Sequence, residues 1–372
     1  MGIIIMKTAK AIVITDRTEE RIQPEIFYSF KTASNRLPVE DRLTFKFYNF
    51  NPYMIEFEEP LSFARAKQRI MDLLNNCVDT VVNIKKKTSN GQPLIQAILV
   101  YIEENIDSPI SVLNNEIKKM MDDFTFLVIE STATTVIHPI FYKPEVLDIK
   151  SGAAVADDIK DTLYALFFLE AAFSQDKPVF GTCHGAQAAY LLAGGGLTKV
   201  FKQKGLPYSD TFYARENPNN GTKELWQIDV ELNTRDRKDF HNFQTVKYPL
   251  PEIFKSQNAI GEQKWVNKDF RHTLAMTDPV PDSVDVLSYH PLSKNQRKEK
   301  AVDSFEIQGD YFASPEKVNK FKSTLKDITI VDAFKYKTLI GFQYHPHYTF
   351  DEFDTSEIFD YFIQKIIKVL KD

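Results

Sequence analysis

Short apolar segments alternate along the chain with longer segments in which apolar residues recur every three or four positions. The short segments have strand length and predict strands at 9–15, 43–50, 124–129, about 179–181, 225–232, 284–289, 328–334 and 338–344. The longer segments predict helices at about 24–35, 61–75, 93–104, 112–122, 157–173 and 358–370. Strands that alternate with helices in this way predict an α/β fold.

Composition and charge exclude several classes of protein. The chain has 372 residues, of which 43% are hydrophobic, so it can bury a large core, and its net charge of -5 gives no basic signal for nucleic acid. No apolar run approaches the length of a membrane span, and the apolar start is too short for a signal peptide. Cys77 and Cys183 are the only cysteines, which excludes a disulfide framework and predicts a reducing, cytoplasmic location. Cys77 lies on a helical apolar pattern, which predicts packing rather than chemistry.

The most distinctive motif is a cysteine between two glycines, where a short buried strand runs directly into a helix. It spans Val179–Gln187, with Gly181 and Gly185 on either side of Cys183. Glycines here allow a tight turn and let a substrate approach, so the thiol would stand at the tip of the sheet. The positive end of the helix dipole favours the thiolate there. The alternative is a buried cysteine beside an ordinary strand-to-helix turn.

A histidine at the end of a later strand could supply the matching base. In the stretch 339–347 an apolar strand ends in His345, which precedes a proline. A cysteine nucleophile needs a group that takes its proton and later protonates the leaving group. Histidine usually does this because its pKa lies near working pH. Residues far apart in sequence can meet at strand ends, although His345 could also be a surface histidine in a loop.

Together, the two stretches resemble the class I glutamine amidotransferase-like superfamily. The elbow of that superfamily reads Gly-x-Cys-x-Gly-x-Gln, and this chain supplies every named position. The histidine stretch reads Gly-x-Gln-x-His-Pro-Glu, and this chain supplies Gly341, Gln343, His345 and Pro346. The resemblance covers roughly residues 8–35, 110–200 and 280–372. It implies a three-layer, flavodoxin-like fold in which helices cover both faces of a mostly parallel sheet.

Shorter segments are similar to the gamma-glutamyl hydrolase branch, which includes gamma-glutamyl-gamma-aminobutyrate hydrolases. They are 177–179 before the elbow, 194–197 after its helix, Pro139–Tyr142 and Val286–His290. The implied reaction is hydrolysis of a gamma-glutamyl or glutamine side-chain amide through a thioester. The substrate would be a small molecule or a peptide, and no metal or organic cofactor is needed. In that reaction Cys183 attacks the carbonyl and His345 shuttles the proton.

The resemblance also assigns supporting residues. The backbone N–H of His184 and one from the loop near Thr134 would hold the oxyanion, and Gln187 would help to hold the substrate. Gln187 could equally pack inside the protein or point to solvent. His290 is a further contact candidate, or a strand-end histidine satisfied by a backbone group. His184 is not expected to bind a metal, because no second ligand stands at helical spacing.

The chain departs from the superfamily at the third triad position. The glutamate that follows His-Pro is here His347, which can accept a hydrogen bond but carries no negative charge. Asp351, Glu352 and Asp354 could substitute, although a solvated acidic cap before the last helix is the favoured interpretation. The Gly-Gly pair of the oxyanion loop is replaced by Ala133-Thr134, and a Cβ disfavours unusual backbone dihedrals.

We expect a single domain over residues 1–372, enlarged by insertions at about 51–110 and 203–280 that narrow the mouth of the active-site cleft. The lysines 85–87, between the first two inserted helices, predict a solvated turn in preference to an anion site. A second hypothesis follows from the altered triad and oxyanion loop: an impaired, non-hydrolytic binding protein whose insertions recognise a protein partner. A third is another cysteine-elbow enzyme, such as a dienelactone hydrolase-like or protease-type relative, against which Gln187 and the Gln343–Pro346 stretch argue.

Overall fold

The computed structural model describes most of the predicted core. It covers residues 7–15, 19–50, 60–88, 93–130, 137–142, 153–199, 274–277, 279–291, 329–343, 346 and 353–371, with four short strands between residues 214 and 266. Those four strands form two small antiparallel pairs, β6 (Ala214–Glu216) with β7 (Lys223–Leu225) and β8 (Val246–Lys247) with β9 (Trp265–Val266). The predicted strand at 225–232 therefore has only its first residue in a described strand.

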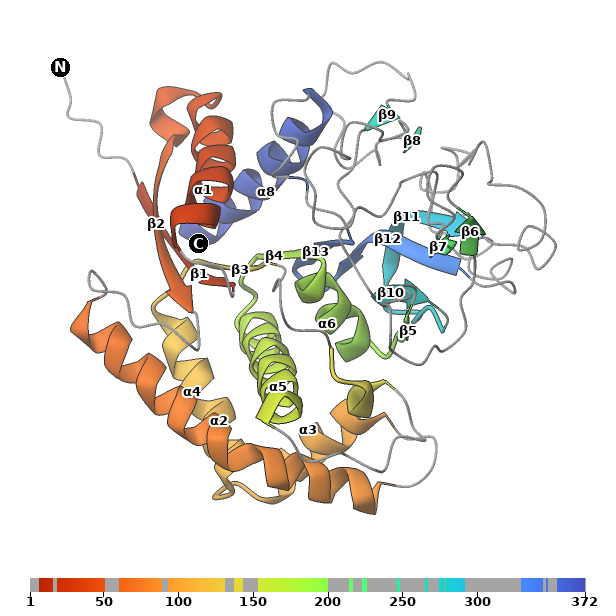
Figure 1. Cartoon of the computed structure of the whole chain (residues 1–372). Helices are drawn as coiled ribbons and strands as arrows, with labels where there is room; N and C mark the ends of the chain where they lie inside the picture. The colour runs from red at the N-terminus through yellow and green to blue at the C-terminus, as the bar shows by residue number, and fades with distance from the viewer. Residues whose placement is uncertain are drawn as a thin grey trace.

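The centre of the fold is a mixed sheet in the order β2-β1-β3-β4-β13-β12-β10-β5, with β11 beside β12 (Figure 1). The strands are β1 Lys7–Ile14, β2 Leu43–Phe50, β3 Phe126–Ile129, β4 Val179–Thr182, β5 Gly196–Lys199, β10 Leu274–Thr277, β11 Asp285–Pro291, β12 Thr329–Tyr336 and β13 Leu339–Phe342. The run from β2 to β13 is parallel, and the remaining pairings are antiparallel.

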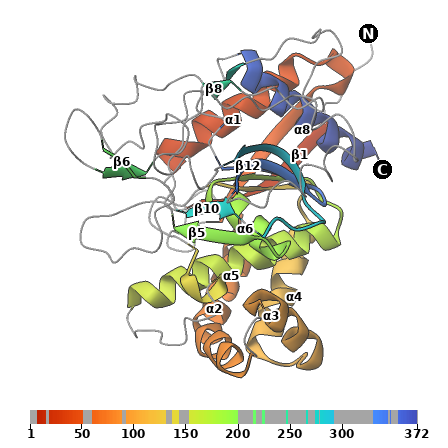
Figure 2. The same ribbon diagram turned by 90° about the vertical axis from the view of Figure 1, so that its right-hand side faces the viewer.

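Helices cover both faces of this sheet. Figures 1 and 2 show α1 (Glu19–Asn35) and α8 (Phe353–Lys371) together on one face. On the other face α5 (Ala153–Ser174) packs on β3, and α6 (His184–Leu192) packs on β4 and β13. The predicted three-layer α/β fold is confirmed. None of the described helices is long and apolar enough to cross a bilayer.

Three further helices extend the layer that contains α5. They are α2 (Leu61–Lys87), α3 (Leu94–Glu104) and α4 (Pro109–Asp122), and α2 packs against both α4 and α5 (Figure 1). Short 3-10 turns lie at Val39–Asp41 and Pro139–Phe141. The predicted inserted helices at 51–110 thus belong to a packed helical layer.

The prediction for the end of α2 was wrong. The helix does not stop near residue 75 but continues to Lys87, so the lysines 85–87 form its last helical turn. Lys86 and Lys87 are exposed to solvent, as predicted, whereas Lys85 is buried. Cys77, Val81 and Ile84 are buried and continue the apolar face of the first half of the helix. Lysines near a helix C-terminus also interact favourably with its dipole. Cys77 is packed in the core, as expected, and its burial raises the pKa of its thiol to about 12.

The last part of the predicted 203–280 insertion belongs to the main sheet. β10 pairs with β5 in antiparallel register, so that Lys199, at the end of β5, faces Leu274, at the start of β10. The chain therefore leaves the sheet and returns to it at directly opposed positions. The remaining boundaries of the two insertions stay predictions.

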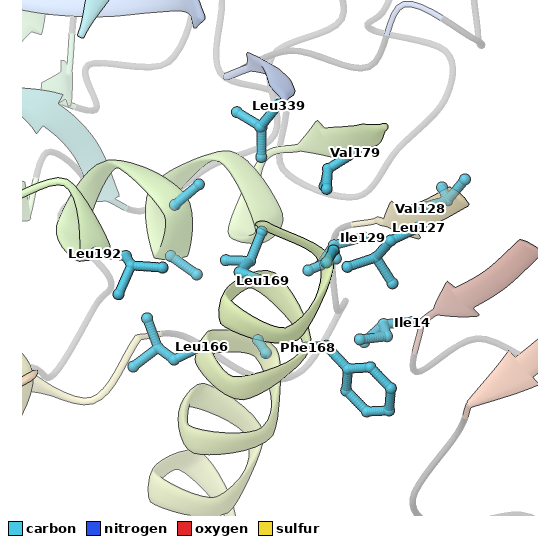
Figure 3. Close-up of a cluster of buried hydrophobic side chains, with 14 of the residues drawn as sticks. Ile14, Leu127, Val128, Ile129, Leu166, Phe168, Leu169, Val179, Leu192 and Leu339 are labelled. Atoms are coloured by element: carbon cyan, nitrogen blue, oxygen red, sulfur yellow. The ribbon is translucent and has the colours of Figure 1, made fainter. Parts of the chain in front are cut away.

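Both faces of the sheet bury a hydrophobic core. Figure 3 shows part of the core beside α5, where Leu166, Phe168 and Leu169 lie near side chains of β1, β3 and β4. On the other face the core is aromatic and centres on Phe30 of α1, which is fully buried. The ring of Phe30 lies 5.3–6.0 Å, between centroids, from the rings of Phe45, Phe47, Phe126, Phe180, Phe359 and Phe362. One side chain thus connects α1 and α8 to β2, β3 and β4.

Phe30→Ala should lower the free energy of unfolding by about 3–5 kcal/mol, because it removes a buried ring and leaves a cavity. Phe27→Ala is the matched control, since Phe27 lies on the same helix but is 36% exposed. That variant should lose less than about 1.5 kcal/mol. Urea denaturation of both variants measures the difference. Equal losses would contradict a central role for Phe30.

Candidate functional site

Cys183 is the pivot of a sharp turn between β4 and α6. Its backbone adopts φ 45° and ψ -104°, a positive φ that non-glycine residues rarely take. Such a conformation costs about 1–3 kcal/mol and is held only by its surroundings. The cysteine, rather than a flanking glycine, therefore takes the unusual dihedrals. This is the geometry of a strained nucleophile elbow at the carboxyl end of a strand.

Gly185 is required for a different reason, the close approach of α6 to β3. A Cβ on Gly185 would lie 2.5 Å from the carbonyl oxygen of Ile129 and 2.6 Å from its Cβ. At Gly181 the nearest atom to an added Cβ is 3.2 Å away, on the side chain of Leu339. The second glycine of the motif thus lets the first turn of α6 sit directly on the end of β3.

The elbow and the histidine stretch begin on neighbouring parallel strands. β4 pairs with β13 so that Gly181 faces Gly341 and Thr182 faces Phe342. The backbone N–H of Cys183 continues this pairing and donates to the carbonyl of Phe342 over 2.7 Å. Cys183 therefore stands one residue past the end of β4, and His345 follows three residues after the end of β13. The carboxyl ends of both strands share one edge of the sheet, as the motifs predicted.

Gln187 is buried inside the protein. Its Nε2 donates to the carbonyl oxygen of Leu274 over 2.7 Å and to Oε1 of Gln343 over 3.4 Å. Among the described residues, these contacts join α6, β10 and the segment that leads to His345. The alternative that Gln187 packs inside the protein therefore describes this structure, and a contact with substrate remains a prediction.

His184, the first residue of α6, has a buried side chain whose ring nitrogens find no hydrogen-bond partner among the described residues. Burial lowers the pKa of its imidazole to about 4, so the ring is neutral at pH 7. Its predicted contribution to the site is its backbone N–H. The side chain adds neither a positive charge nor a second base beside Cys183.

Several predicted site residues lie outside the described part of the chain. They are His345, His347, Thr134 with its neighbour Ala133, and the acids Asp351 and Glu352. His290 lies on β11, where it faces Ile330 in the register, but its side chain is also outside the described part. Asp354 falls in the first turn of α8 rather than before it. The roles of all these residues remain predictions.

Two buried polar residues at this edge of the sheet were given no role by the sequence. Glu130 follows the apolar strand β3, directly before residues 131–136, and its carboxylate Oε2 accepts a hydrogen bond from the hydroxyl of Thr15 over 3.4 Å. The sequence feature that could have identified Glu130 is an acidic residue at the end of an apolar strand. Gln343 was recognised only as part of a motif. In the described part of the chain, no group of three or more His, Cys, Asp or Glu residues could hold a metal ion.

The buried, neutral state of His184 makes stability depend on pH. An ordinary histidine has a pKa of 6.5, so the unfolded chain binds more protons than the folded chain between pH 6.5 and about 4. This contribution to stability is fully present above pH 6.5 and is lost as the pH falls through about 4. His184→Leu removes it. The variant should therefore gain on the order of 3 kcal/mol over the wild type between pH 7 and pH 4.

Urea denaturation of both proteins at pH 7 and pH 4 measures this gain. His138, whose pKa burial also lowers to about 4, is present in both proteins and cancels in the comparison. A difference between the two proteins that stays constant with pH would contradict a neutral, buried His184.

Comparison with known proteins gives a family. The family model described as glutamine amidotransferase class-I matches residues 104–365. None of the curated proteins compared with the chain matches it. Among solved structures, the chain is similar to a protein assigned to GMP synthase from Thermoplasma acidophilum, with 9% identity, TM-score 0.38, and coverage of 98% of this chain and 96% of that chain. It is also similar to the glutaminase domain of Trypanosoma brucei CTPS with bound acivicin, with 11% identity, TM-score 0.36, and coverage of 97% and 94%.

Neither structural likeness adds to the assignment, because both TM-scores are below 0.5. The family match spans most of the chain and includes both the Cys183 elbow and the His345 stretch. Its extent and the α/β fold lead to one conclusion: the chain belongs to the class I glutamine amidotransferase family.

Proposed function

We propose that this protein hydrolyses the side-chain amide of glutamine or of a gamma-glutamyl compound, with Cys183 as nucleophile and His345 as base. The pairing of β4 with β13 carries the proposal. It holds a strained cysteine at the end of one strand and starts the histidine stretch from the end of its neighbour. Acyl transfer through a thioester requires a nucleophile and a base within reach of each other, and adjacent strand ends are positions from which two such residues can meet.

The reaction would proceed in two balanced steps. His345 takes the proton of the Cys183 thiol, and the sulfur attacks the amide carbon to give a tetrahedral oxyanion. The C–N bond then breaks, and the imidazolium gives its proton to the departing ammonia or amine, which leaves a thioester. His345 next takes a proton from water, whose oxygen attacks the thioester. The C–S bond breaks, which releases the carboxylic acid, and the imidazolium of His345 returns its proton to the sulfur of Cys183, which restores the thiol.

The oxyanion would be held by backbone N–H groups. The amide of His184 is among the first of α6, and the first amides of a helix have no acceptor within that helix. They also lie at the positive end of the helix dipole, which favours a negative oxygen. We place the second donor in the loop near Thr134. Loss of one such donor typically costs about a hundredfold or more in rate, so the Ala133-Thr134 pair bears directly on turnover.

The proposed substrate class is gamma-glutamyl compounds. The segments similar to the gamma-glutamyl hydrolase branch support a gamma-glutamyl substrate, either a small molecule or a peptide. The resemblance offers Gln187 and His290 as substrate contacts. The Gln187 side chain is buried, and its amide nitrogen bonds to Leu274 and Gln343, so we propose His290 as the substrate contact. The insertions would narrow the mouth of the cleft, and they could also receive a protein partner.

An impaired, binding-only protein is the second candidate. Its support is the replacement of the family's glutamate by His347, together with the loss of the Gly-Gly pair at Ala133-Thr134. A protein of this kind would bind a glutamine-like compound at the elbow without releasing a product.

A glutamine-analogue electrophile should form a covalent adduct on Cys183, detectable by mass spectrometry, because His345 activates the thiol. Cys183→Ala should form none, and His345→Asn should react much more slowly. Cys77→Ala is the control and should label like the wild type, because Cys77 is buried and its thiol has a raised pKa. A Cys183 that labels equally fast with and without His345 would contradict the dyad.

His347→Glu should raise turnover if His345 has no anionic partner. Loss of a triad carboxylate typically costs on the order of ten thousandfold in rate, so restoring one should recover a measurable part. The assay is hydrolysis of gamma-glutamyl test substrates, with Cys183→Ala as the blank. A wild type as fast as ordinary relatives and unchanged by the substitution would refute the impaired triad. No turnover by any variant would favour the binding-only protein.

A further inference from the structure

The two glutamines of the family motifs are in contact with each other. Nε2 of Gln187, on α6, lies 3.4 Å from Oε1 of Gln343, the residue that follows β13. The two residues are separated by 156 positions in the chain. Gln343 is fully buried and Gln187 almost so, at 0% and 3% exposure. Solvent therefore does not compete for this contact.

A backbone carbonyl fixes the orientation of both amides. The oxygen of Leu274 can only accept a hydrogen bond, so the Gln187 atom that lies 2.7 Å from it must be the amide nitrogen. That nitrogen has two hydrogens, and the second points to Gln343. The Gln343 atom that faces it must then be the carbonyl oxygen. The Leu274 carbonyl on β10 thus fixes the orientation of the Gln187 amide, and the Gln187 amide fixes that of Gln343.

Gln343 lies at a position where a small displacement would change the placement of the proposed base relative to Cys183. It follows Phe342, whose carbonyl accepts the backbone N–H of Cys183, and it precedes His345 by two residues. Its own Nε2 is buried and has no hydrogen-bond partner in the part of the chain that the structure describes. Loss of the Gln187 contact would leave both polar ends of this buried amide without a described partner, directly before the segment that carries the proposed base.

We propose that Gln187 and Gln343 are positioning residues that align the His345 segment with Cys183, and that the carbonyl of Leu274 anchors the pair. This inference rests on the proposed Cys183–His345 dyad and gives Gln187 a role apart from holding the substrate. The anchor lies on β10, the strand with which the chain returns to the sheet after residue 273. The return strand of the predicted insertion is thereby joined directly to the site.

The test is Gln187→Met in the full-length protein, which keeps the length of the side chain and removes the donor. Misplacement of a catalytic group by about 1 Å can cost on the order of a hundredfold in rate. We expect kcat for a gamma-glutamyl substrate to fall tenfold to a hundredfold with little change in KM. The pH profile for alkylation of Cys183 by iodoacetamide should also shift towards that of His345→Asn. Gln343→Met should act in the same way, and the double variant should lose no more than the worse single variant.

Gln175→Met is the matched control. Gln175 also donates its side-chain amide to a backbone carbonyl, that of Lys118, over 2.9 Å, but it lies after α5 and before the elbow strand begins. This variant should lower the melting temperature and leave the alkylation profile unchanged. A merely structural role for Gln187 would give the same pattern and would overturn the proposal.

The remaining outcomes distinguish failure of the positioning role from failure of the Cys183–His345 dyad. A raised KM with unchanged kcat and an unchanged alkylation profile would assign Gln187 to substrate holding and overturn the positioning role. Additive effects of the two glutamine substitutions would also overturn it. Failure of the dyad looks different, because the wild type itself would then alkylate with the same pH profile as His345→Asn.

Discussion

The parallel pairing of β4 with β13 is the interaction on which the candidate site depends. It extends past the strand ends through the hydrogen bond from the Cys183 N–H to the Phe342 carbonyl, so the strained turn is tied to the neighbouring strand. Unusual dihedrals persist only where surrounding contacts over-determine them. The close packing of Gly185 against Ile129 restrains the turn a second time, from the side of β3. Cys183 is thus held between β13 and β3.

The aromatic core around Phe30 stabilises the strand that leads into the elbow and its neighbour β3, from the face of the sheet that α1 and α8 cover. Phe126 on β3 and Phe180 on β4 pack against Phe30 and against Phe362 of α8. Large buried rings contribute much of the burial energy of a core, and their contacts add to it. The strands that lead into the elbow are therefore among the most rigidly supported parts of the described fold, which suits a site that relies on fixed geometry.

The sequence was sufficient for the strands and for the elbow, because these are local patterns. β2 at Leu43–Phe50 was predicted with its bounds, and Cys183 stands where its flanking glycines implied. The length of α2 was misjudged because the lysine run was interpreted as a turn, although no glycine or proline interrupts the helix before it. The contact between Gln187 and Gln343 could not be predicted, because it depends on how distant segments meet and on a backbone carbonyl that orients both amides.

The antiparallel match of Lys199 with Leu274 also has an evolutionary consequence. It fixes the two ends of the segment 200–273 against each other. The entropic cost of closing a loop rises by only about 0.6 kcal/mol for each doubling of its length, so that segment can grow or shrink at little cost to the sheet. A shift of β10 by one residue, by contrast, would turn its side chains to the opposite faces and move the carbonyl that Gln187 uses. Selection would therefore act on the register of this strand far more strongly than on the length of the segment before it.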